Sequence, residues 1–121
     1  MLVLDLGLLA TFHDAAPAAK ILAQSRQARL VLFGFRKGQA LDEHSTSSSL
    51  TAQAISGKVQ FHTQDESVIL LPGELLILPP NTVHKIVALE ESTVLAYLMP
   101  NPEAHTLQKE VFDKLTPMIE I

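Results

Sequence analysis

The sequence predicts an all-β domain, because short apolar runs alternate with turn residues along most of its length. Brief, closely spaced runs of this kind are typical of β-sandwiches and β-barrels. A tight hairpin is expected at Ser56-Gly57, since glycine readily adopts positive φ between two strands. A chain of 121 residues is long enough to bury the core of one domain, spanning residues 1–121. The predicted strands are Leu30–Arg36, Leu50–Ile55, Lys58–His62, Ser67–Leu71, Leu75–Leu78, Val83–Leu89 and Thr93–Met99.

An N-terminal arm, residues 1–27, precedes the strand-rich core of about residues 28–100. We expect a further strand at Lys20–Ala23, paired with the run that follows it. The competing interpretation is a short helix over Ala15–Gln27, because Ala and Lys favour helix. Pro17 permits a helix only near its first turn, so the strand is preferred.

One short amphipathic helix is predicted near the C-terminus, over about residues 103–115. Leu107, Val111 and Leu115 recur every four residues, with polar side chains between them. Pro117 lies just beyond and is typical of a helix end.

The composition argues against several classes of function. A net charge of −4, with Lys and Arg scattered, gives no basic surface for nucleic acid, so we expect no nucleic-acid partner. The absence of cysteine excludes disulfides and thiolate metal sites and fits a cytoplasmic protein. The apolar start is short, lacks a basic region and carries Asp5, which makes it a poor signal peptide. No apolar run is long enough to cross a membrane.

Three of the predicted strands are apolar at both odd and even positions: Leu30–Phe35, Leu75–Leu78 and Val94–Met99. A half-exposed strand alternates, whereas this pattern indicates burial on both faces. A small barrel has one internal face, so the other needs a cover. A second subunit or the C-terminal helix would provide it, and we predict a homodimer.

Two glycine-bracketed segments each end in one histidine. The first is Gly38–His44, closing at Gly57, and the second runs from Gly73 through Pro79 to His84. The spacing of both resembles the two motifs of the cupin superfamily. The resemblance implies a double-stranded β-helix, or jelly-roll barrel, of the small single-domain bacterial, RmlC-like type.

In the second segment, Asn81 stands where cupins usually have a glycine, and asparagine tolerates the left-handed conformation that such a position needs. The first segment departs further from the cupin pattern. Thr46 replaces the second histidine of the His-x-His pair, and Leu50 occupies the position of the acidic ligand.

The resemblance therefore leaves two of four usual metal ligands, His44 and His84. Imidazole nitrogen suits Zn, Fe, Ni and Cu, but two protein ligands are fewer than the three typical of catalytic sites. The metals expected here are Zn, Fe, Ni or Mn. One divalent metal, weakly held, is one expectation, and no metal at all is the other. Strict alternation along an extended strand would place Asp42 on the same face as His44 and Thr46, able to orient or supplement the imidazole. The alternative for Asp42 is an exposed loop acid.

The residues around this pair predict a mainly apolar pocket. Leu50, Ala52 and Ala54 share one face of their strand, and the small alanines leave space. With the hydroxyl of Thr46 and two imidazoles, the pocket would suit a largely apolar ligand with one polar anchor. The alternative is that large neighbouring side chains, such as Phe33, Phe35, Phe61 or Met99, fill the space.

Three hypotheses about function follow. The first is binding of a small organic ligand in the barrel, with or without a loosely held metal and with no assignable reaction. The second is a metal-dependent cupin enzyme, a dioxygenase or isomerase of a small organic acid. The third is a structural or regulatory dimer with a degenerate site. The missing ligands favour the first and third, and the sequence leaves open whether the protein is an enzyme.

Overall fold

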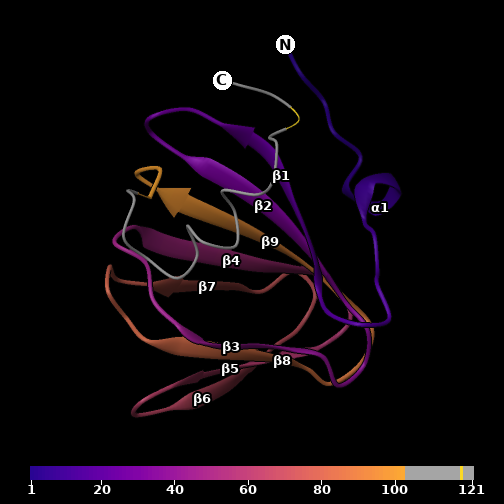
Figure 1. Cartoon of the computed structure of the whole chain (residues 1–121), viewed down its shortest axis with the longest axis vertical. Helices are drawn as coiled ribbons and strands as arrows, with labels where there is room; N and C mark the ends of the chain where they lie inside the picture. Colours follow the sequence, from indigo (N-terminus) through magenta and orange to yellow (C-terminus); the bar gives the residue numbers. More distant parts are fainter. Residues whose placement is uncertain (103–117, 119–121) are drawn as a thin grey trace.

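Two antiparallel β-sheets packed face to face make up the domain (Figure 1). The computed structural model describes residues 1–102 and residue 118. The strands are β1 (Ala18–Gln24), β2 (Arg29–Phe35), β3 (Ala40–His44), β4 (Ser49–Ser56), β5 (Val59–Thr63), β6 (Ser67–Leu70), β7 (Leu75–Leu78), β8 (His84–Ala88) and β9 (Ser92–Met99). The five-stranded sheet has the order β1-β2-β9-β4-β7 and the four-stranded sheet β3-β8-β5-β6. The all-β jelly roll that the sequence predicts is confirmed.

The hydrophobic core lies between the two sheets. On β4 the buried residues alternate with half-buried ones, so that Leu50, Ala52 and Ala54 all face inward. Phe35 and Phe61 face them from both sheets and are almost completely buried. Burying one such aromatic side chain stabilises the fold by about 1.5–3 kcal/mol.

Two turns have the backbone conformation that the sequence predicts. Gly57 has a φ of 81° between β4 and β5, and a Cβ there would collide with the carbonyl oxygen of Glu91. Asn81 has a φ of 64° between β7 and β8, in the left-handed region. The Asn81 N–H donates a 2.7 Å hydrogen bond to the carbonyl oxygen of Thr46. This bond ties the loop before β8 to the loop after β3.

The N-terminal arm contains a strand, as preferred over the helix: β1 spans Ala18–Gln24 and pairs with β2. A register shift between Ile21 and Ala23 interrupts that pairing. The predicted C-terminal helix over residues 103–115 lies outside the described residues. Within the part of the chain that the structure describes, no helix has the length and apolar character needed to span a bilayer.

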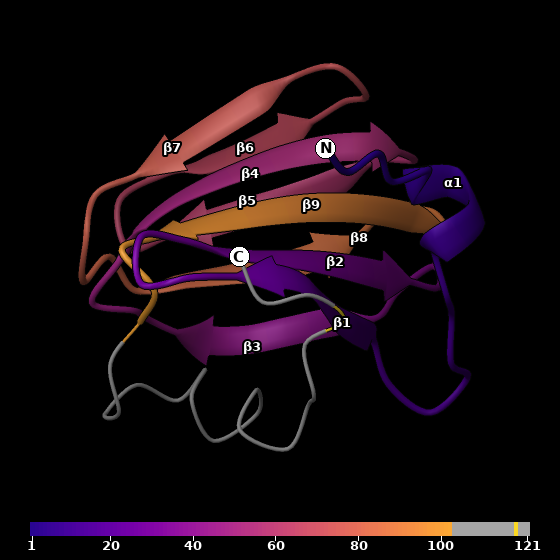
Figure 2. The ribbon, with the colours of Figure 1, turned by 90° about the horizontal axis from the view of Figure 1, so that it is seen from above.

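The N-terminal segment covers the outer face of the five-stranded sheet (Figure 2). It includes the one-turn helix α1 (Leu6–Leu9), and the Lys20 ammonium anchors the segment by donating to the carbonyl oxygen of Leu9. Its apolar side chains pack on Leu22, Leu32 and Leu95. This segment thus supplies part of the cover that the sequence analysis assigned to a second subunit or to the C-terminal helix. That analysis missed it because the apolar start of the chain was considered only as a candidate signal peptide.

Candidate functional site

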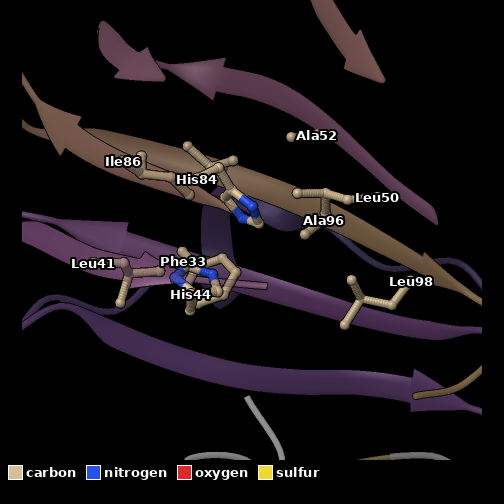
Figure 3. A pocket seen from close by; sticks show the side chains of 10 residues that line it. Phe33, Leu41, His44, Leu50, Ala52, His84, Ile86, Ala96 and Leu98 are labelled. Atoms are coloured by element: carbon tan, nitrogen blue, oxygen red, sulfur yellow. The ribbon is translucent and has the colours of Figure 1, made fainter. Parts of the chain in front are cut away.

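The two motif histidines meet inside the barrel. His44 is the last residue of β3, His84 is the first of β8, and the two lie directly opposite each other in the four-stranded sheet. Their ring centroids are 4.3 Å apart, with the ring planes tilted by 59°. Figure 3 shows both imidazoles projecting into the space between the sheets. Strand pairing therefore brings together two residues that are forty positions apart in the sequence.

A β-bulge in β3 sets the direction of His44. Leu41 pairs with Ile86 and His44 with His84, so three residues on β3 span what two residues span on β8. Leu41 and His44 consequently both line the inner cavity. The expectation of strict alternation is wrong here: the side chain of Asp42 is exposed and does not share the face of His44.

Backbone carbonyls fix the hydrogen position on each imidazole. Nδ1 of His44 lies 2.7 Å from the carbonyl oxygen of Asp42, and Nδ1 of His84 lies 2.9 Å from that of Thr82. A carbonyl oxygen only accepts, so Nδ1 carries the hydrogen in both rings and Nε2 of each neutral ring keeps its lone pair. Nε2 of His84 is buried and has no hydrogen-bond partner within the described part of the chain.

Burial lowers the pKa of His84 below its ordinary value of 6.5. The hydrogen bond to the Thr82 carbonyl opposes this effect, because it favours the protonated ring, and the neighbouring His44 adds a smaller lowering. His84 is accordingly neutral at pH 7 and acts as a hydrogen-bond acceptor or metal ligand through Nε2.

The cavity beside the two imidazoles is small and otherwise apolar. Its volume is about 10 Å³ for the centres of water-sized molecules, which is room for about one water or ion. Apart from the histidines, its walls are aliphatic or aromatic (Figure 3): Phe33, Leu41, Leu50, Ala52, Ile86, Val94, Ala96 and Leu98.

The predicted pocket residues divide into two groups. Leu50 and Ala52 line the cavity, whereas Thr46 and Ala54 are buried outside its lining. Thr46 is structural instead: its Oγ1 accepts a hydrogen bond from the backbone N–H of Ser48, and its carbonyl accepts from Asn81. Thr46 lies in the loop after β3, where side chains no longer alternate between two faces. Extending the alternation beyond His44 therefore predicted the wrong position for the Thr46 hydroxyl.

Sequence reasoning named Phe33 as a large neighbour of the pocket but missed five other wall residues: Leu41, Ile86, Val94, Ala96 and Leu98. Most of these residues take every second position along β8 or β9. Strand alternation therefore predicts that they face inward, once it is known which strands pair. Within the described residues, no three His, Asp or Glu side chains gather closely enough to hold a metal ion.

The family model of AraC-like ligand-binding domains matches residues 31–116. The chain belongs to this family. The match includes every strand that supplies the histidine pair and its apolar walls. Membership of this ligand-binding family indicates small-molecule binding as the role of the domain. No curated protein matches the chain.

Solved structures place this AraC-like domain in the cupin superfamily. A protein from Thermus thermophilus is similar with a TM-score of 0.78 and 25% identity, over 84% of this chain and 100% of that one. A cupin superfamily protein from Desulfitobacterium hafniense has a TM-score of 0.75 at 21% identity, covering 81% and 90%. An RmlC-like cupin from Desulfovibrio desulfuricans has a TM-score of 0.70 at 26% identity, covering 75% and 89%. The cupin resemblance seen in the sequence is confirmed.

Proposed function

We propose that this domain binds a small organic ligand at the His44–His84 pair, alone or together with one weakly held divalent metal. The observation that carries the proposal is the buried Nε2 of His84, which has no partner within the described residues and lines the cavity. A buried polar atom left without a partner costs about 1–3 kcal/mol. An occupant that donates a hydrogen bond or coordinates Nε2 would recover that free energy.

The protonation of the two rings selects the chemistry of the occupant. Both Nδ1 atoms donate to carbonyls, so each ring in its neutral form offers only an acceptor, Nε2. A hydroxyl, an amine or a metal ion can bind there directly. A bare carboxylate would need either a protonated imidazole or an intervening cation.

The donor set fits a metal, but a loosely bound one. Histidines that bind metals commonly donate the other ring hydrogen to a carbonyl, as both do here. Zn, Fe, Ni or Mn would have two protein ligands, because Leu50 stands on the cavity wall without a ligand atom. Water or an oxygen of the organic ligand would complete the coordination.

The size of the cavity limits how much of the ligand enters. Room for about one water admits a single hydroxyl, amine or ion, not a whole organic molecule. A larger ligand would have to displace wall side chains such as Leu50 or Phe33, or remain partly outside. The metal-dependent enzyme is the second hypothesis, and the two-ligand donor set favours binding over it.

A nickel titration tests this proposal on untagged protein. Wild type should bind about one Ni²⁺ per chain by calorimetry, and His84→Gln should lose that binding while remaining folded. His13→Ala, which removes an exposed histidine elsewhere, is the control and should bind as wild type. A thermal-shift screen of small alcohols, amines and acids should raise the melting temperature of wild type only. The proposal would be wrong if His84→Gln bound nickel as tightly as wild type and no compound stabilised the wild-type protein.

We also propose that the domain acts in the cytoplasm as a homodimer. Support for the dimer comes from β7, where Leu75 is 54% and Ile77 66% exposed on the outer face of the five-stranded sheet. They lie on the same face of the sheet as the apolar surface that the N-terminal segment covers, with Thr51 and Gln53 of β4 between the two. Ile77→Lys should shift a dimeric mass to a monomeric one in sedimentation at micromolar concentration. A monomeric wild type under those conditions contradicts the dimer.

A further inference from the structure

A second hollow lies at one end of the four-stranded sheet, where β3 and β5 end and β8 begins. It has a volume of about 380 Å³ for water-sized molecules, within the range of roughly 300–1,000 Å³ typical of ligand sites. The residues that line it come from the end of β3, the start of β8 and the end of β5. His84 also borders this hollow, so the hollow adjoins the histidine pair, whereas His44 lines only the inner cavity.

Neighbouring residues on one strand divide the two spaces. His84 borders both the buried cavity and the hollow, whereas the next residue, Lys85, lines only the hollow because side chains alternate along β8. His62 lies directly opposite Lys85 on β5. Glu43 falls within the bulge of β3, on the other side of Lys85. A carboxylate, an ammonium and an imidazole therefore line the same hollow from three adjacent strands.

The two opposite charges of the hollow do not pair with each other. Within the described part of the chain, the ion pairs belong to Arg36, which lies elsewhere, so Glu43 and Lys85 each keep an unpaired charge. Val83, 49% exposed, adds an apolar wall beside them. A ligand complementary to this arrangement carries a carboxylate, an ammonium and a small apolar group.

We propose that this hollow binds a small zwitterion of the α-amino-acid type with an apolar side chain. The ammonium of Lys85 and the ring of His62 receive the ligand carboxylate, and the Glu43 carboxylate receives the ligand ammonium. The apolar side chain of the ligand packs on Val83.

Nitrogen–proton correlation spectra of the labelled full chain, titrated with three matched compounds, test the proposal. L-valine carries both charges, isovalerate lacks the ammonium, and isobutylamine lacks the carboxylate. Valine should shift the amide signals of residues 62–64 and 83–85 in a saturable way. Each analogue should bind at least about threefold more weakly, since an exposed ion pair contributes a modest free energy.

Two variants, each replacing a charged side chain with an uncharged amide, test which residue contacts which group of the ligand. Lys85→Gln and Glu43→Gln should each weaken valine binding at least about threefold, and Glu43→Gln should also remove the preference for valine over isovalerate. Lys37→Gln, at an exposed lysine outside the hollow, should bind valine as wild type does. Absence of saturable shifts at these residues, equal binding of the three compounds, or insensitivity to both variants would overturn the proposal. The signal of His44, which lines the inner cavity but not the hollow, reports separately on the inner cavity.

Discussion

The inner cavity and the outer hollow adjoin at His84, which borders both, yet their chemistry is opposite. The cavity beside His84 is apolar and has room for about one water, whereas the hollow beside Lys85 is charged and far wider. Adjacent residues of β8 face the two spaces because side chains alternate across a sheet. The comparison teaches that a single position along a strand decides whether a group is held neutral in the interior or charged in solvent.

The inner and outer faces of the four-stranded sheet should differ most in how strongly a substitution changes the stability of the fold. Two adjacent residues of β5, one on each face, allow this comparison. Phe61 is 1% exposed in the core, and His62 points to the outer face. Phe61→Ala should lower the free energy of unfolding by about 3–5 kcal/mol, because it leaves a cavity among packed side chains. His62→Ala should change it by less than about 0.5 kcal/mol. Urea unfolding measures both, and equal losses would contradict the inner and outer assignments.

A third ligand should strengthen the inner site. Leu50→Glu places a carboxylate at the cavity wall, and the affinity for Ni²⁺ should rise about tenfold or more over wild type. Without metal the variant should be less stable than wild type, because a buried charge lacks a partner. Thr51→Glu is the matched control, since the adjacent residue faces outward and should leave the affinity unchanged. Equal affinities in the two variants would place Leu50 away from the histidine pair.

The smallest expected effect is a dependence of stability on pH. Because the pKa of His84 is lowered in the folded protein, the unfolded chain binds more protons between that pKa and 6.5. The free energy of unfolding should therefore fall as the pH drops below about 6.5 and stop falling once the folded protein is also protonated. His84→Gln should lose this component, and His62→Ala should keep it. Identical pH profiles for wild type and His84→Gln would refute a buried neutral ring.

Turn positions and strand identities could be predicted from the sequence because their causes are local. The positive φ of Gly57 and Asn81 follows from which residues tolerate that conformation. The inward faces of Leu50 and Ala52 follow from alternation within one strand. The prediction that the two imidazoles meet was based on the spacing of the two motifs.

The remaining features of the site depend on more than one strand. The bulge that turns Asp42 outward exists only relative to β8, so no pattern within β3 reveals it. Thr46 was misplaced because the chain leaves the strand after His44. The outer hollow was missed since Glu43 and Lys85 each look like an ordinary exposed charge until the strands are placed side by side.

One peptide hydrogen bond, from Asn81 to Thr46, has a consequence for how this domain tolerates change. It fastens together two loops, each of which leads directly to one of the imidazoles. An insertion in either loop would move its own histidine and pull on the other. Sequence variation among relatives should accordingly be correlated in length between these loops, while the hairpin of β5 and β6 is free to lengthen.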